Sequence, residues 1–331
     1  MSLAESVLAG DLLALARLLT QVENDLPEGR HALDALFPHA GRAHLIGVTG
    51  GSGTGKSSLV NRLALHYRHP PAGEARRVAI VAVDPSSPFT GGAVLGDRVR
   101  MGDLSGDPGV FIRSMAARGS LGGLAQTTAA VAQVFDAAGF EVVLVETVGA
   151  GQSEVEIARL AHTTLVVEAP GLGDDIQAIK AGILEIADIL VVNKADLPGA
   201  DKTERALKAM LGLAHPVRKE FLPHAPAGPD GGKDDAPLWV PPIRRTNALD
   251  GTGVDGLAES IGKHAAYLHK SGEWKRRERA RLEFELQALL IGTLAAQFRS
   301  RVGERRYAEV LDGLVARRLS PGEAVEALMQ F

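Results

Sequence analysis

The chain of 331 residues contains no cysteine, which excludes disulfide bonds and metal sites built on thiolates. It has no apolar run of the ~18 residues that a membrane-spanning helix needs, so we expect no membrane partner. Basic residues are not in excess, since the formal net charge is −4 and the pI is about 6.2, which argues against a nucleic-acid partner. The opening residues Met-Ser-Leu-Ala-Glu-Ser also lack the basic region of a signal peptide. From these absences we expect a soluble, cytoplasmic protein.

Short apolar runs alternate with amphipathic segments along most of the chain, and 45% of the residues are hydrophobic. This pattern predicts an α/β fold with a mostly parallel sheet flanked by helices. The runs predict strands over residues 45–48, 78–83, 110–113, 142–145, 164–168, 189–192 and 239–243. Helical spacing with one apolar face runs from Leu8 to Val22, and from about residue 252 the strands stop. We expect an N-terminal helical extension (1–43), an α/β domain (44–250) and a C-terminal helical part (251–331).

A glycine-rich loop follows the first apolar run, in the pattern Gly50-x-x-x-x-Gly55-Lys56-Ser57, and an amphipathic helix begins directly after it. This is a Walker A loop in its strand–loop–helix setting, where glycine backbone N–H groups and the helix N-terminus surround a phosphate. Lys56 would reach the β- and γ-phosphates, and the Ser57 hydroxyl would ligate Mg²⁺. The predicted nucleotide-binding stretch is Gly50, Gly51, Ser52, Gly53, Thr54, Gly55, Lys56, Ser57 and Ser58. We interpret the chain as a P-loop nucleotide hydrolase, the alternative being a glycine-rich turn that binds nothing.

Three acidic residues are candidates for the metal shell and for catalysis beside Lys56. Asp84 ends the second predicted strand, on the ligand side of an open sheet, although it could also be a simple turn or helix cap. Asp97 lies in the polar, glycine-rich segment that follows. Glu146 ends the run 142–145 and precedes Gly149, where many GTPases carry Asp-x-x-Gly and the glycine N–H meets the γ-phosphate.

A guanine signature, Asn193-Lys194-x-Asp196, follows the run 189–192. The Asp196 carboxylate can accept from both guanine N1–H and the 2-amino group. Adenine lacks both donors and would leave the carboxylate unpaired, a difference worth roughly 10⁴-fold in selectivity. We expect Asn193 to tie this loop to the P-loop and Lys194 to lie along base and sugar. Further on, Thr246, Asn247 and Ala248 occupy the place of a second base-reading loop, where the Ala248 N–H would donate to the base carbonyl.

The C-terminal part reads as four helices, over residues 253–268, 274–299, 305–316 and 321–329. Ser320 with Glu323 forms a capping box before the last one. An apolar stripe in the second is made of Leu282, Leu286, Leu289, Leu290 and Leu294. This stripe either packs on the parent domain or forms a dimer arm, and we favour the arm.

The combined motifs resemble the MeaB-type GTPases, also known as ArgK or LAO/AO transport-system proteins. The segments that carry the resemblance are 47–50 with 55–57, 83–87, 95–98, 111–114, 145–154, 173–183 and 187–196. The resemblance covers nearly the whole chain and implies a P-loop NTPase of the SIMIBI class that uses GTP/GDP and Mg²⁺. It implies metal-shell roles for Asp84, Asp97 and Glu146.

The family consists of G-protein chaperones of adenosylcobalamin-dependent acyl-CoA mutases such as methylmalonyl-CoA mutase. The resemblance therefore implies slow GTP hydrolysis that a mutase stimulates, gating of adenosylcobalamin delivery, and protection or reactivation of the mutase. It also implies a homodimer joined through the C-terminal helices and admits the cobalamin adenosyltransferase as a partner. The resemblance further implies a third switch segment around Asp174, Gln177 and Lys180, which senses the bound nucleotide and communicates with the mutase.

Three other functions fit parts of the pattern. A nickel or cobalt metallochaperone GTPase would share the architecture, but such proteins usually carry Cys or His clusters. A P-loop metabolite kinase would need an acceptor pocket and need not read guanine. A scaffold that holds nucleotide without hydrolysing it is the third.

Overall fold

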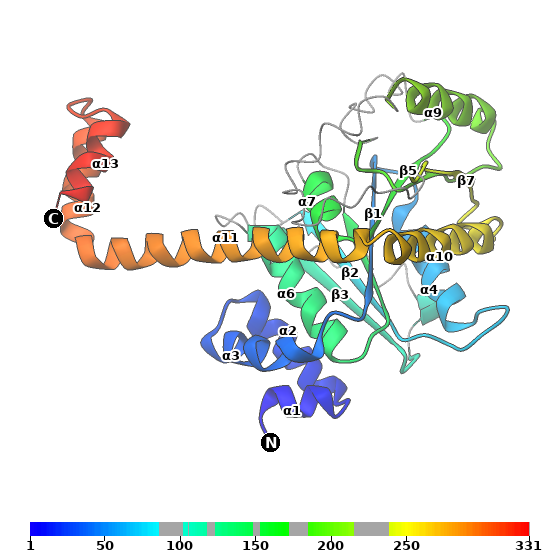
Figure 1. The fold of residues 1–331 in the computed structure, drawn as a ribbon, viewed down its shortest axis with the longest axis horizontal. Coiled ribbons are helices and arrows are strands. Elements are labelled where there is room, and N and C mark those ends of the chain that lie inside the picture. Colours follow the sequence, from blue (N-terminus) through cyan, green and yellow to red (C-terminus); the bar gives the residue numbers. More distant parts are fainter. Residues whose placement is uncertain are drawn as a thin grey trace. The chain divides into compact units, whose positions relative to one another are not determined.

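Seven strands pair into one sheet within the residues that the computed structural model describes, which are 1–85, 102–104, 106–117, 123–147, 153–171, 185–214 and 238–330. The strands are β1 (His44–Gly50), β2 (Val78–Pro85), β3 (Val110–Ala117), β4 (Val142–Thr147), β5 (Thr163–Glu168), β6 (Ile189–Val192) and β7 (Ile243–Arg245). Their order is β3-β2-β4-β1-β5-β6-β7, and every pairing is parallel (Figure 1). The predicted fold class is confirmed.

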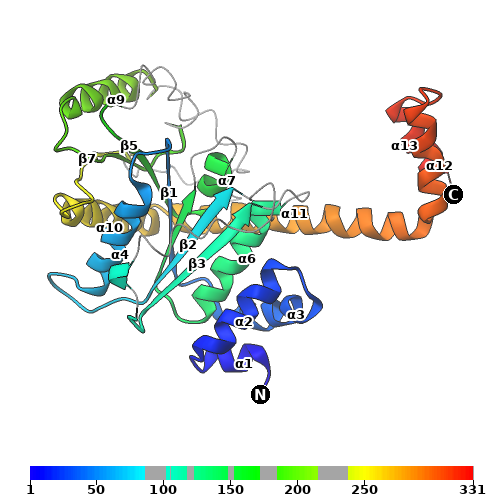
Figure 2. The same ribbon diagram turned by 180° about the vertical axis from the view of Figure 1, so that it is seen from behind.

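Helices cover both faces of this sheet (Figures 1 and 2). One face packs against α4 (Lys56–Arg68) and α10 (Val254–Lys270), and the other against α6 (Gly123–Ala137), α7 (Ser153–Leu160) and α9 (Ala200–Ala214). The central strands are buried on both faces, which is why their sequences are continuous apolar runs and not alternating patterns. Because all the strands are parallel, their carboxyl ends lie at one edge of the sheet. Ligands bind at this carboxyl edge in open α/β folds.

Three helices precede the sheet: α1 (Leu3–Leu8), α2 (Leu12–Glu23) and α3 (Pro27–Leu36), followed by the 3₁₀ turn η1 (Phe37–His39). The single apolar face expected from Leu8 to Val22 is wrong in its first part, because Leu8, Leu12 and Leu13 are exposed. Gly10 has a φ of +89°, and the Asp11 side chain caps a new helix there, so the chain turns where one helix was predicted.

A buried carboxylate holds the entry to β1. The Asp136 side chain, at the end of α6, accepts hydrogen bonds from the backbone N–H groups of Gly41, Arg42 and Ala43, at 2.6–3.2 Å. Of the three residues Ala43 is buried, so its N–H in particular would otherwise lack a partner. The contact fixes the N-terminal helices to the sheet layer.

The last strand lies later than predicted. The sequence favoured a strand over residues 239–243, whereas β7 covers Ile243–Arg245. Pro241 and Pro242 have no N–H to give to a ladder, so pairing with β6 begins only after them. Trp239 instead donates its Nε1–H to the Asp188 carbonyl, at 2.8 Å.

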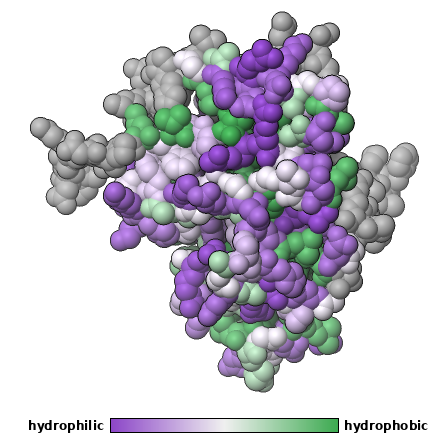
Figure 3. All heavy atoms as spheres, turned by 90° about the vertical axis from the view of Figure 1, so that its right-hand side faces the viewer, coloured by the Kyte–Doolittle hydropathy of each residue, from purple (hydrophilic) through white to green (hydrophobic). Residues whose placement is uncertain are grey.

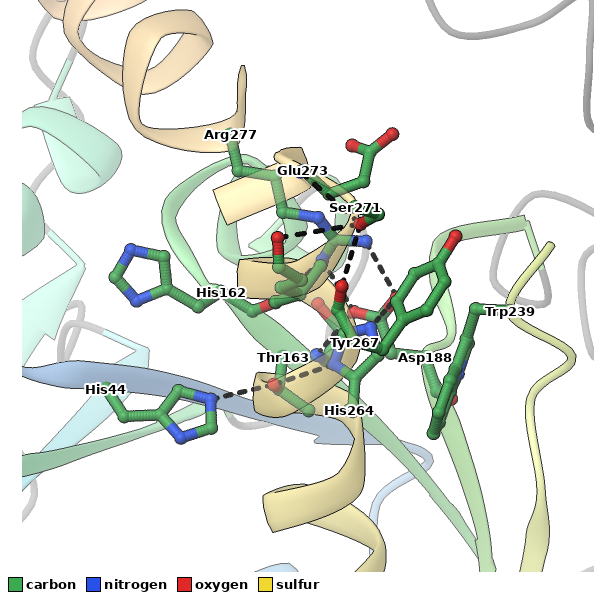
Figure 4. Close-up of polar contacts among 12 residues, drawn as sticks. His44, His162, Thr163, Asp188, Trp239, His264, Tyr267, Ser271, Glu273 and Arg277 are labelled. Carbon is green, nitrogen blue, oxygen red and sulfur yellow. Dashed lines mark hydrogen bonds and ion pairs between the residues drawn. The ribbon is translucent and has the colours of Figure 1, made fainter. Parts of the chain in front are cut away.

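A buried polar cluster lies at the amino edge of the sheet, opposite the carboxyl edge. We call it the amino-end cluster; it comprises His44, His162, Thr163, Asp188, His264 and Arg277 (Figure 4). The Arg277 guanidinium, from α11 (Glu273–Val302), donates to both Asp188 oxygens at 2.8 and 2.9 Å. Thr163 Oγ1 joins His44 Nε2 and His264 Nδ1 at 2.8 and 2.9 Å.

The histidine nearest α11 has its tautomer set by its neighbours. His162 Nδ1 accepts the Leu45 N–H at 3.1 Å, so Nε2 carries the proton that faces Glu278 at 3.0 Å. The Trp274 ring stacks on His162 with ring centroids 3.8 Å apart. The first turns of α11 are thus attached to the starts of β1, β5 and β6.

The described chain divides into two compact units, Met1–Arg281 and Leu282–Phe331. The second consists of the rest of α11, α12 (Glu304–Val315) and α13 (Pro321–Met329). The predicted capping box before α13 is present, with Ser320 and Glu323 bonded in both directions. The helix α10, which the sequence placed with the C-terminal part, packs on the sheet of the first unit.

The side of the molecule that carries α9 and α10 is shown in Figure 3, where hydrophilic residues predominate. Ion pairs contribute to this surface, among them Arg245 with Asp201 and Glu204. No helix in the described ranges is long and apolar enough to cross a membrane.

Candidate functional site

The loop between β1 and α4 leaves the sheet at its carboxyl edge and depends on glycine at defined points. Gly50 has a φ of +139°, and a Cβ there would lie 2.0 Å from the Val167 carbonyl oxygen of β5. Gly55 has a φ of +90°, and a Cβ there would lie 2.5 Å from Asn193 Nδ2. The backbone therefore passes where side chains would block it, as an anion-binding loop requires.

The lysine of the loop is almost fully buried beneath it. Lys56 Nζ donates to the carbonyl oxygens of Gly50 and Gly51, at 3.0 and 2.9 Å. Its ammonium is thereby held inside the curve of the loop, at the N-terminus of α4. An ammonium at this point attracts anions together with the helix N-terminus.

Two predicted metal-shell residues meet directly at this edge. Ser57 Oγ donates to Glu146 Oε1 at 2.6 Å, and Glu146 is buried at the end of β4. In the sheet register Glu146 lies between Val48 of β1 and Ala82 of β2. A hydroxyl and a carboxylate oxygen in contact are the donor types that Mg²⁺ takes, so these residues fit the ion.

Asn193 connects the two ends of the site through its side-chain amide. Its Nδ2 donates to the Thr54 carbonyl of the P-loop at 2.8 Å. Its Oδ1 accepts from Thr246 Oγ1 and from the Ala248 N–H, both at 3.1 Å. Since Asn193 is buried, this one amide holds the P-loop and the loop after β7 at a fixed separation.

The residues after Asn193 form an exposed turn beside the P-loop. Lys194 has a φ of +54°, and its Nζ donates to the Gly53 carbonyl at 2.8 Å. The Ala195 N–H donates to the Thr246 carbonyl at 3.0 Å. Asp196 follows with its carboxylate exposed at the same turn. An exposed carboxylate between two loops is available to a ligand's donor groups.

The loop after β7 is closed by its own side chains. Asn247 Nδ2 donates to Asp250 Oδ2 at 2.8 Å, and the Thr252 N–H donates to Asp250 Oδ1 at 2.8 Å. The Thr252 hydrogen bond is the main reason that the pKa of Asp250 is below its ordinary value. The Ala248 N–H, predicted to meet a base carbonyl, here donates to Asn193, so a base would share or exchange that hydrogen bond.

Comparisons with known proteins agree on one family. The family profile described as "Methylmalonyl Co-A mutase-associated GTPase MeaB" matches residues 15–302. The chain belongs to the MeaB family. It is 42% identical to a putative GTPase of Pyrococcus horikoshii over 99% of this chain and 96% of that one. It is 33% identical to GTPase ArgK of Escherichia coli, over 100% and 96% of the two chains.

A solved structure of similar fold is that of an LAO/AO transport system kinase, with a TM-score of 0.67 and 27% identity. The match covers 99% of this chain and 96% of that chain. The resemblance to MeaB, ArgK and LAO/AO proteins is therefore confirmed, and this MeaB-family chain shares its P-loop fold with them.

Several predicted site residues of the MeaB-family chain lie outside the described ranges. They are Asp97, Gly149, Asp174, Gln177 and Lys180. Asp84 is described only as a backbone position in β2, next to the strand that carries Glu146. The structure does bring Lys56, Ser57, Glu146 and the Asn193 motif to one edge, while their roles remain predictions.

One residue of this edge was missed by the sequence reasoning: Arg62 of α4 donates to the carbonyl oxygens of Ala248 and Leu249. Thr246, which the sequence placed in the base-reading loop without a role, contributes its hydroxyl to Asn193. Arg62 has no signal in sequence, since it acts on a loop more than a hundred residues away.

Proposed function

We propose that this protein binds GTP with Mg²⁺, hydrolyses it to GDP and phosphate, and uses the nucleotide state to act on an adenosylcobalamin-dependent acyl-CoA mutase. The observation that carries the proposal is the Asn193 amide, which joins a P-loop to a loop suited to a base. Asp196 stands at the same turn with an exposed carboxylate. A site with this connection binds phosphates and base together, and the carboxylate selects guanine.

The chemistry asked of the residues is positioning and charge stabilisation. The Lys56 ammonium, which donates to the carbonyls of Gly50 and Gly51 at 3.0 and 2.9 Å, would turn from them to the β- and γ-phosphates. Ser57 and Glu146 would hold Mg²⁺, with Asp84 and Asp97 completing its shell. The ion supplies neutralisation of phosphate charge when bound. A water attacks the γ-phosphorus in line, and the bond to the GDP oxygen breaks.

The mutase partner rests on the family, whose description names mutase-associated GTPases. Delivery of adenosylcobalamin, protection or reactivation of the mutase, and contact with the adenosyltransferase belong to the same proposal. Asp174, Gln177 and Lys180 would transmit the nucleotide state, which requires that the mutase bind one nucleotide state better than the other. A homodimer through the C-terminal helices is supported by the exposed leucines of α11.

The function is tested first by calorimetric titration with GDP and ADP. We expect GDP to bind at least ~10³-fold more tightly, because only guanine offers both donors to Asp196. Asp196→Asn should shift the preference toward xanthine nucleotides, whose 2-oxo group accepts a hydrogen bond where guanine donates one. Equal affinity for GDP and ADP would contradict the proposal.

Phosphate release with and without methylmalonyl-CoA mutase tests the enzymatic part. Wild-type protein should release phosphate faster with the mutase, while Lys56→Ala should bind nucleotide weakly and release almost none. Lys180→Ala should bind GTP normally but lose stimulation. If the wild type stays at the Lys56→Ala background with every acyl-CoA mutase tried, hydrolysis is not its function.

A further inference from the structure

Arg62 lies on α4, the helix that begins at Lys56, and reaches across to the loop after β7. Its Nε donates to the Ala248 carbonyl at 3.1 Å, and its Nη2 donates to the Leu249 carbonyl. The guanidinium is a planar fork, so two carbonyls of successive residues fix its orientation and theirs. One helix thereby carries the phosphate-binding lysine at its start and a clamp on the distant loop along its length.

The clamp acts on the residue whose N–H is the candidate reader of a base. The Ala248 N–H points to Asn193 Oδ1 at 3.1 Å, and the Ala248 carbonyl points to Arg62. These two hydrogen bonds hold Ala248 through both of its peptide groups, and the residue is buried. Backbone hydrogen bonds hold Thr246 and Asn247 just before Ala248, and the loop's remaining side-chain bonds connect Asn247, Asp250 and Thr252 among themselves. Without Arg62, the Ala248 carbonyl would lose its side-chain partner, and the Ala248 peptide would be held on its N–H side alone.

We infer that Arg62 is a positioning residue for guanine recognition, holding Ala248 so that its N–H addresses the 6-oxo group. This inference rests on the proposed function. It divides the reading of the base into two parts: Asp196 reads N1–H and the 2-amino group, and the Arg62–Ala248 pair reads the carbonyl. Only the second part depends on α4.

The test compares GDP with 6-thio-GDP, which keeps the donors for Asp196 but replaces the 6-oxo acceptor with sulfur, a weak acceptor. Arg62→Met keeps the aliphatic stem and removes the donors. We expect it to lower GDP affinity about fivefold to tenfold, the size of one misplaced hydrogen bond, and 6-thio-GDP affinity less than about twofold. The wild-type preference for GDP over 6-thio-GDP should then largely disappear.

Arg68→Met is the matched control on the same helix. Arg68 donates to both oxygens of Asp107 at 2.8 Å, remote from the loop after β7. This variant should lose stability but keep the GDP to 6-thio-GDP ratio. If Arg62→Met does not fold, Arg62→Lys serves instead, since one ammonium cannot bind both carbonyls in the geometry of the fork.

Equal losses for both nucleotides in Arg62→Met would overturn the inference and leave Arg62 a merely structural residue. An unchanged GDP affinity would overturn it as well. A wild type that does not prefer GDP to ADP would instead contradict the proposed function, so the two failures are distinct.

Discussion

Gly50 marks a point where two stretches of backbone come closer than any side chain allows. A Cβ at this position would meet the Val167 carbonyl oxygen of the neighbouring strand β5 at 2.0 Å. The residue also has a left-handed φ of +139°. The next residue, Gly51, has only a side-chain carbon within 4 Å of its ideal Cβ, at 3.6 Å. The fold therefore requires glycine at position 50, whereas position 51 has room for a Cβ.

We expect Gly50→Ala to destabilise the nucleotide-free protein by more than about 2 kcal/mol, because strain and overlap add. Gly51→Ala should change stability by less than about 1 kcal/mol, since its Cβ meets ordinary contact only. Urea unfolding without nucleotide measures both. Equal effects of the two substitutions would show that β5 relaxes around the extra carbon.

Residues of the site were predictable where the chemistry is carried by a local motif. Lys56, Ser57 and Asn193 come from such motifs, and the structure brings them to one edge. Arg62 could not be predicted, because its partners are the carbonyls of Ala248 and Leu249 and backbone carbonyls carry no residue identity. Contacts of this kind depend on the fold and not on the local sequence.

The attachment of α11 at the amino edge of the sheet depends on groups that titrate. Burial keeps the pKa of His162 below its ordinary value, and it lowers the pKa of His44 further. Burial alone would raise the pKa of Asp188, but the charge and hydrogen bonds of Arg277 outweigh it and hold that pKa below its ordinary value. The fold therefore favours neutral His162 and His44 and an ionised Asp188.

The free energy of unfolding should fall as the pH drops below about 6.5, the ordinary pKa of histidine. Below that value the unfolded chain binds more protons than the fold, in which His162 and His44 stay neutral, so acid favours unfolding. Asp188 adds a second loss below about pH 4, as its carboxylate protonates in the unfolded chain first. Urea unfolding between pH 8 and about pH 3 measures the slope in both ranges.

His162→Gln is the control for this prediction. It should lower stability at neutral pH, because the hydrogen bonds to Leu45 and Glu278 are weakened, but it should reduce the slope. A stability that is flat or rises between pH 7 and pH 5 would contradict the account, and so would an unchanged slope in this variant.

Elements with one dominant pattern were predictable from sequence. The buried runs of β1, β2 and β4 were found because parallel strands with both faces covered are apolar throughout. The start of β7 was wrong because the run 239–243 includes two prolines that cannot join a ladder. The helices α1 and α2 were predicted as one helix because apolar spacing continues across Gly10, where the backbone turns.

At the scale of the whole molecule, the second unit carries exposed apolar residues on α11. Leu286 is 65% exposed and Leu290 is 53% exposed, one helical turn apart on α11. Neighbouring leucines such as Leu289 and Leu294 are also exposed. Their spacing gives one apolar stripe, which is the arrangement by which helices associate.

We expect the protein to be a homodimer, and Leu286→Glu combined with Leu290→Glu to shift it to a monomer in sedimentation equilibrium. Placing carboxylates in an apolar interface is costly, so the shift should be complete at micromolar concentrations. Leu13→Glu is the matched control, because Leu13 is 61% exposed but lies on α2. A dimer that survives the double substitution would place the interface elsewhere.

The Asn193 junction has a consequence for synthesis of the chain. Asn193 lies 139 positions after Thr54, and Ala248 follows Asn193 by 55. The phosphate loop is therefore translated long before the groups that would fix its partner loop and read a base. In the proposed GTP-binding protein, the phosphate loop is thus made before either of the groups that would read the base. Asp196 follows it, and the Ala248 N–H is added only after β7 has been translated.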